Sequence, residues 1–178
     1  GNYNLIFGVR VQPHLHDYEL MVREQGVFKL NIDGLMAQLK ASLISGVQKL
    51  FLVLNFPSNP TGYTLTKKES DDLVEALSTV FDDLSISKDN EPVLTILLDE
   101  AYHGMEWEDD CCRESLFFRL SKLNSNQFVI CKVDGSTKEM FFFGGRIGFL
   151  SFAAQPDAAQ ILEEKAIGCI RSSISALS

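Results

Sequence analysis

Residues 50–62 read LFLVLNFPSNPTG, an apolar run that ends in a turn rich in asparagine and proline. The apolar part, residues 50–54, has the continuity typical of a strand that is covered on both faces. The prolines and Gly62 restrict the backbone that follows, so Asn59 can meet a ligand without the cost of ordering a flexible loop. The stretch therefore predicts a buried strand with a rigid polar turn at its carboxyl end.

The rest of the chain alternates short apolar runs with helical patterns. Two further strand candidates, residues 93–98 and 128–133, are each followed by an aspartate. Helical patterns cover residues 35–43, 66–81, 115–123 and 157–174, and the second of them begins with a capping box from Thr66 to Glu69. This alternation predicts an α/β domain with a mostly parallel sheet. Because no repeat or linker divides the chain, we treat residues 1–178 as a single domain.

Composition excludes several classes of function. The 178 residues are 46% hydrophobic, which favours one globular domain with its own core. The net charge is −8 and the basic residues are scattered, so we expect no nucleic-acid partner. No run approaches the roughly 18 to 20 apolar residues of a membrane span. The four cysteines lack a Cys-x-x-Cys spacing, so we expect reduced thiols and a cytoplasmic location.

Polar residues with chemical potential follow the strand candidates. Ligands of parallel sheets sit beyond the carboxyl ends of the strands, so these residues are expected to meet at one edge. The candidates are Asn59, Asp99, Tyr102, Ser136, Thr137, Lys138 and Arg146. Together they offer an amide, a carboxylate, a phenol, hydroxyls, an amine and a guanidinium.

This set of groups suits a phosphorylated pyridine aldehyde. The Lys138 amine can condense with the aldehyde, and the Asp99 carboxylate can keep the ring nitrogen protonated. Tyr102 and Asn59 can donate hydrogen bonds to the 3-oxygen of the ring. For the phosphate the chain offers Arg146 together with the hydroxyl of Ser136 or Thr137, and both hydroxyls stay open as candidates.

Three of these patterns, in this order, resemble a known family. They are Asn-Pro-Thr-Gly at residues 59–62, Asp99-x-x-Tyr102, and Lys138 with Arg146 eight residues on (146 − 138 = 8). The chain resembles the class I/II aminotransferases, which are pyridoxal-phosphate enzymes of the aspartate aminotransferase fold, or fold type I. Their joint occurrence is far more specific than any one pattern alone.

The resemblance implies a fold, a cofactor and partners. The fold is a three-layer α/β/α large domain with a mostly parallel sheet, and the cofactor is pyridoxal 5'-phosphate. The activity is transfer of an amino group between an α-amino acid and a 2-oxo acid, in a homodimer. In this comparison the chain corresponds to the central part of the large domain, so we expect an N-terminal segment and a C-terminal small domain to be absent from it. A related lyase or decarboxylase, or a catalytically silent fragment, stay as alternatives.

The same resemblance assigns roles to individual residues. It implies that Asn59 and Tyr102 contact the 3-oxygen, that Asp99 pairs with the ring nitrogen, and that Lys138 forms the covalent link. Arg146 is implied to hold the phosphate. One departure is that family members commonly carry serine three residues before the lysine, where this chain has Gly135.

Other motifs have simpler interpretations. His14 and His16 could share one face of a strand as metal ligands, but no nearby cysteine or carboxylate completes a site, so we expect no metal. The acidic residues 106–110 are expected to form a solvated loop, and His103 is expected to be a hydrogen-bonded residue at a strand end. Residues 141–143, three phenylalanines, are expected to be core or subunit-contact residues, with a smaller chance that they shape a substrate pocket. The motifs of nucleotide-binding loops and of serine hydrolases are absent from the sequence.

Overall fold

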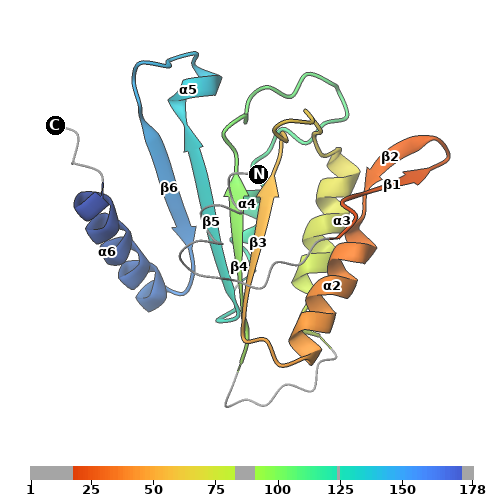
Figure 1. Cartoon of the computed structure of the whole chain (residues 1–178), viewed down its shortest axis with the longest axis horizontal. Helices are drawn as coiled ribbons and strands as arrows, with labels where there is room; N and C mark the ends of the chain where they lie inside the picture. The colour runs from red at the N-terminus through yellow and green to blue at the C-terminus, as the bar shows by residue number, and fades with distance from the viewer. Residues whose placement is uncertain (1–17, 83–90, 124, 174–178) are drawn as a thin grey trace.

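The computed structural model describes residues 18–82, 91–123 and 125–173 (Figure 1). His14 and His16, considered above as metal ligands, lie outside these residues. The elements in chain order are β1 (Met21–Glu24), β2 (Val27–Leu30), α2 (Ile32–Ile44), β3 (Lys49–Asn55), α3 (Lys67–Ser78), β4 (Val93–Asp99), α4 (Leu116–Leu120), β5 (Phe128–Gly135), α5 (Ser136–Glu139), β6 (Gly148–Ala153) and α6 (Pro156–Ser173).

A four-stranded sheet in the order β3-β4-β5-β6 forms the centre of the structure (Figure 1). The first three strands are parallel and β6 is antiparallel to β5. The prediction of an α/β fold with a mostly parallel sheet is confirmed. In the register Asn55 is level with Asp99, and Asp99 is level with Val133, so the carboxyl ends of the three parallel strands meet at one edge.

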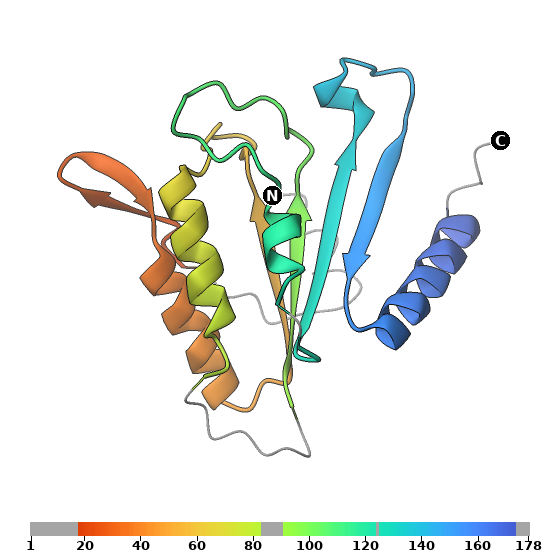
Figure 2. The ribbon, with the colours of Figure 1, turned by 180° about the vertical axis from the view of Figure 1, so that it is seen from behind.

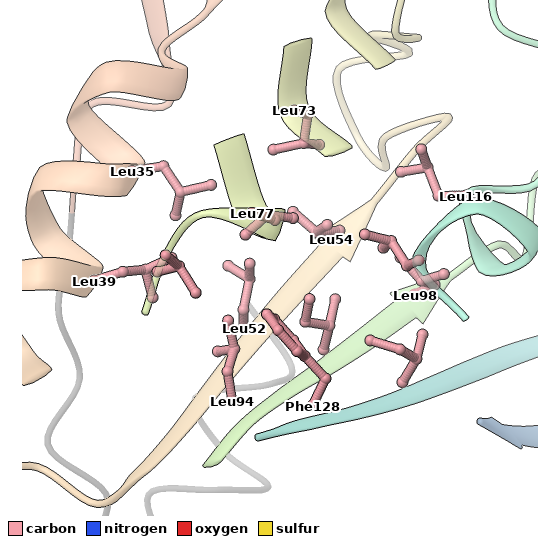
Figure 3. Packing of buried hydrophobic residues seen from close by; sticks show 14 of the residues in the cluster. Leu35, Leu39, Leu52, Leu54, Leu73, Leu77, Leu94, Leu98, Leu116 and Phe128 are labelled. Carbon is pink, nitrogen blue, oxygen red and sulfur yellow. The ribbon is translucent and has the colours of Figure 1, made fainter. Parts of the chain in front are cut away.

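The core lies between one face of this sheet and helices α2, α3 and α4. Alternate residues of each strand point to the same face of a sheet, which is why every second position is buried in β4 and in the second half of β3. Figure 3 shows the leucines of α2 and α3 packed against Leu52 and Leu54 of β3, with Leu98 beside Leu116 of α4. Each fully buried leucine of this kind stabilises the fold by about 1.5–3 kcal/mol.

The N-terminus of α3 is joined to the segments around it through Glu69. The predicted capping box is confirmed, because Thr66 Oγ1 accepts the backbone N–H of Glu69 while Glu69 accepts that of Thr66 at 3.0 Å. The same carboxylate accepts hydrogen bonds from the hydroxyl of Tyr63 and from the backbone N–H of Leu30. Burial alone would raise the pKa of Glu69, but these hydrogen bonds outweigh burial and lower it.

Two strand features were not predicted from the sequence. The first is the β1–β2 hairpin, whose four-residue strands turn at Gln25 and Gly26 with positive φ values of 49° and 88°. The second is the antiparallel strand β6, whose Phe149 and Leu150 are exposed. Helix α6 lies beside β6, at the opposite end of the sheet from α2 and α3 (Figure 2). In the described segments no helix is long and apolar enough to cross a membrane.

Candidate functional site

An open groove of about 330 Å³ lies at the carboxyl edge of the sheet. It is bounded by the end of β4, the end of β5 with α5, and the loop that leads into β6. Its lining includes Asp99, Ala101, Thr137, Lys138, Arg146 and Gly148. Predicted residues from the ends of two neighbouring strands and from the loop that follows α5 therefore share one groove, whose size is within the range of small-molecule sites.

The Asn59 turn is joined to the end of β4 by Asn55, the last residue of β3. The side-chain oxygen of Asn55 accepts the backbone N–H of Asn59 at 2.8 Å, and its Nδ2 donates to the carbonyl oxygen of Asp99 at 3.1 Å. Gly62 has a φ of +72°, which favours glycine, and its N–H donates to Ser58 at 2.7 Å. The turn is thus fixed at both ends, as the sequence predicts.

Asn59 and Tyr102 face each other across the ends of β3 and β4. Asn59 Nδ2 lies 3.4 Å from the Tyr102 hydroxyl, a long hydrogen bond. Two donors that meet in this way can converge on one acceptor oxygen of a ligand. The structure therefore brings together the two residues that were predicted to share the 3-oxygen.

Lys138 lies in α5 directly after β5, and its amine faces aromatic rings. Its Nζ is 5.4 Å from the centroid of the Tyr102 ring and 5.6 Å from that of Phe143. Both distances are within the range of cation–π contacts. Lys138 is partly buried and lines the groove.

Asp99 ends β4 on the face of the sheet opposite to the core. One of its carboxylate oxygens accepts the backbone N–H of Ala101 at 3.2 Å, which fixes the side chain at the strand end. Asp99 and Lys138 line the same groove. A carboxylate and an amine are thereby presented to one small molecule.

Gly135 explains the departure from serine three residues before the lysine. A Cβ atom at this position would lie 2.8 Å from the backbone oxygen of Ile147, closer than real contacts allow. β6 leaves no room for a side chain at position 135, and the next two residues, Ser136 and Thr137, carry hydroxyls. Ser136 is buried, and its Oγ has no hydrogen-bond partner among the described residues, whereas Thr137 lines the groove.

Arg146 reaches the groove from the loop between α5 and β6. It is exposed and has a φ of +50°, an uncommon conformation for a residue with a side chain. Its guanidinium is the only arginine group that lines this groove in the described part of the chain. It can therefore supply a fork of donors to an anion there.

A buried polar cluster supports the turn after β4 from the core side. Glu100 Oε1 accepts the hydroxyl of Ser115 at 2.7 Å, while its Oε2 has no hydrogen-bond partner in the described segments. Burial raises the pKa of the Glu100 carboxyl. Sequence analysis assigned no role to Glu100 or to Asn55, because a strand-end position does not reveal which partner a side chain finds.

Two expectations about nearby loops need correction. Glu106 was predicted to be solvated, but its side chain is only 5% exposed, and it pairs with His103 Nδ1 at 3.5 Å and accepts the N–H of Gly104. This pairing agrees with the hydrogen-bonded histidine that was expected at position 103. The phenylalanines at 141–143 were expected to be core or subunit-contact residues. All three are more than half exposed in this chain, which excludes a core position, and the subunit contact stays a prediction.

Glu108, Asp110 and Cys111 lie near one another in the same acidic loop. Ligand atoms of these three residues are within 4.8 Å of each other. Both carboxylates are exposed, and burial raises the pKa of the Cys111 thiol, which opposes the thiolate form that binds metals. The cluster gives no reason to abandon the expectation of a solvated loop at these carboxylates.

A family model described as aminotransferase class I and II matches residues 15–176. The chain belongs to this family. All of the candidate site residues lie within the matched range, so the resemblance predicted from three motifs is confirmed at the level of the family. A comparison with curated proteins gave no match.

Solved structures with the same fold include aminotransferases. An aminotransferase of Anaerococcus prevotii has a TM-score of 0.61 at 21% identity, over 84% of this chain and 34% of that one. The aromatic-amino-acid aminotransferase of Burkholderia pseudomallei, covalently bound to pyridoxal phosphate, has a TM-score of 0.50 at 21% identity, over 82% and 32%. A pyridoxal-phosphate-bound C-S lyase of Staphylococcus hominis has a TM-score of 0.50 at 14% identity, over 83% and 32%.

These comparisons support the fold and the cofactor class. The chain spans about a third of the length of the solved structures that it matches. The family and the bound cofactor of two of these structures support pyridoxal phosphate as the cofactor that the sequence predicted. Since a lyase shares the fold, the comparisons support an enzyme of this kind more strongly than any one reaction.

Proposed function

We propose that this chain is the central part of the large domain of a pyridoxal-phosphate-dependent aminotransferase. The observation that carries the proposal is that Lys138 and Arg146 line one groove with Asp99, although Asp99 lies far from both in the sequence. The substrates are an α-amino acid and a 2-oxo acid. We expect a homodimer, as the resemblance to this family implies, and a reducing, cytoplasmic compartment, because the cysteines show no Cys-x-x-Cys spacing.

The donor set of the groove fits this cofactor. When bound, pyridoxal phosphate supplies an aldehyde that joins covalently to an amine and a ring that withdraws electrons from the substrate α-carbon. Lys138 is the amine at this groove, and after release it is placed to move a proton from the α-carbon. Asp99 holds a proton on the ring nitrogen, which keeps the ring electron-poor.

The remaining residues orient the ring and hold its phosphate. Tyr102 and Asn59 donate to the 3-oxygen, as their mutual contact of 3.4 Å supports. Arg146 binds the phosphate as a charged fork. We choose Thr137 over Ser136 as the hydroxyl partner, because Thr137 lines the groove and Ser136 does not.

A lyase is the second candidate, supported by the C-S lyase of Staphylococcus hominis with the same fold. Lys138, Asp99 and Arg146 hold the cofactor in either case, and the bond that breaks depends on how the substrate is oriented over the ring. Residues that orient the substrate decide between the two reactions. The same reasoning applies to a decarboxylase.

Two absorbance experiments test the proposal. Adding pyridoxal phosphate is expected to produce a visible absorbance band that Lys138→Ala abolishes. A featureless spectrum would favour the alternative of a catalytically silent fragment. Adding an amino acid should then remove the band and a 2-oxo acid should restore it, whereas release of ammonia or a thiol without this cycle would favour a lyase.

A further inference from the structure

Phe143 lies beside the reactive amine although the sequence assigned it no role there. Its ring centroid is 5.6 Å from Lys138 Nζ, on the loop that follows α5, while Tyr102 approaches the same Nζ at 5.4 Å from the end of β4. A phenylalanine that is 56% exposed gains little from burial at this position. The contact with the amine gives its ring a specific use.

We propose that Phe143 is a positioning residue, whose ring restrains Nζ of the groove-lining Lys138 together with the ring of Tyr102. This inference rests on the proposed function for its consequence, since the amine is held where the cofactor aldehyde would arrive. A lysine side chain has many rotamers, and two ring faces restrict them without forming a bond that the reaction must break. An ion pair with a carboxylate would hold the amine more firmly, but it would have to break before the amine could react.

The loop is built so that Phe143 stays close to α5. The backbone N–H of Phe141 donates to the oxygen of Lys138 at 3.3 Å, and that of Phe142 donates to Ser136 at 3.4 Å. The Phe142 ring packs over Gly145, where a Cβ atom would lie 2.3 Å from the ring. These contacts fix the residues on both sides of Phe143.

The three phenylalanines therefore have different surroundings. Phe142 packs within the loop, Phe143 faces the amine, and Phe141 is 72% exposed. Phe141→Leu is a matched control for Phe143→Leu, because it makes the same change two residues away in the same loop. Phe143→Tyr keeps a ring face and serves as the rescue variant.

A cofactor-free measurement tests the placement directly. In protein labelled with carbon-13 lysine, ring currents should move the ε-methylene proton resonance of Lys138 upfield of those of other lysines, with Lys138→Arg giving the assignment. Phe143→Leu should move this resonance downfield, while Phe143→Tyr and Phe141→Leu leave it in place. An unchanged resonance in Phe143→Leu would overturn the inference, and so would an equal loss in Phe141→Leu.

Titration with pyridoxal phosphate tests the consequence. Phe143→Leu should raise the dissociation constant about two- to five-fold, the effect of one exposed cation–π contact, and Phe143→Tyr should restore it. If wild type fails to bind pyridoxal phosphate while the resonance responds as described, the proposed function fails and the placement of Phe143 stands. If wild type binds and Phe143→Leu binds equally well, the positioning role fails alone.

Discussion

The side chain of Asn55 donates a hydrogen bond of 3.1 Å to the backbone oxygen of Asp99. The two residues are level in the parallel register of β3 and β4, so the bond extends the pairing past the last backbone contacts. Asn55 also accepts the N–H of Asn59. Its side-chain amide therefore holds the end of β4, which carries Asp99, and the Asn59 turn at fixed positions. The geometry of the site therefore depends on a residue that need not touch a ligand.

Removing this amide should weaken both the fold and the site. Asn55→Ala leaves the Asp99 oxygen and the Asn59 N–H without their partner, at a cost of about 1–3 kcal/mol in the free energy of unfolding. Pyridoxal phosphate should also bind more weakly, as titration would measure. The exposed Asn126→Ala makes the same substitution before β5 and should change neither quantity. Equal effects of the two variants would contradict the linking role of Asn55.

Serine at position 135 should be destabilising. The new Cβ would meet the Ile147 oxygen at 2.8 Å, so the β5–β6 pairing must shift. We expect Gly135→Ser to lose about 1–3 kcal/mol in urea unfolding, the usual cost of overpacking. Gly144→Ser is the control, because a Cβ there meets nothing within 4 Å. If Gly135→Ser were as stable as wild type, the close approach of β6 would be wrong.

The Glu100 carboxyl should make stability depend on pH. Burial raises its pKa in the folded state above that in the unfolded state, so the stability that it contributes is present below the unfolded pKa and is lost as the pH rises through the folded value. Glu100→Gln does not titrate and still offers an oxygen to Ser115. Thermal unfolding should therefore show Glu100→Gln gaining stability relative to wild type between pH 4 and pH 8. A difference in melting temperature that is constant over this range would rule out the raised pKa.

The cysteines should differ widely in reactivity. Cys131 is buried in β5, and burial raises the pKa of its thiol to about 11, so little thiolate forms at neutral pH. Cys169 is exposed on α6. A thiol reagent at pH 8 should modify Cys169 first and Cys131 only after unfolding, as peptide mass spectrometry would show. Rapid labelling of Cys131 in the folded protein would place β5 closer to solvent than the structure does.

Sequence patterns predicted the parallel strands because each is a continuous apolar run followed by polar residues. The capping box of α3 could also be predicted, because its two hydrogen bonds join residues that are close in the sequence. β6 was not predicted, because it pairs antiparallel at the edge of the sheet and its residues show no clear alternation of polar and apolar side chains. The β1–β2 hairpin was not predicted, because its strands have only four residues each.

The sequence predicted the candidate residues of the site but not the side chains that support them. Asn59, Asp99, Lys138 and Arg146 follow from strand ends and motif order, and the register then brings the strand ends to one edge. The contact of Phe143 with the lysine depends on a loop whose path no periodicity describes. Burial of Ser136 beside an accessible Thr137 likewise depends on how α5 begins, which left the choice of hydroxyl open at the level of sequence.

Reductive trapping shows which lysine pyridoxal phosphate modifies. The protein is incubated with pyridoxal phosphate, reduced with borohydride, digested and analysed by peptide mass spectrometry. We expect one dominant phosphopyridoxyl group, on Lys138. Its yield should fall at least ten-fold in Asp99→Ala or Arg146→Ala, which corresponds to a loss of about 1.4 kcal/mol in binding free energy. Modification spread over the surface lysines, with Lys138 no more labelled than Lys122 and insensitive to both substitutions, would contradict it.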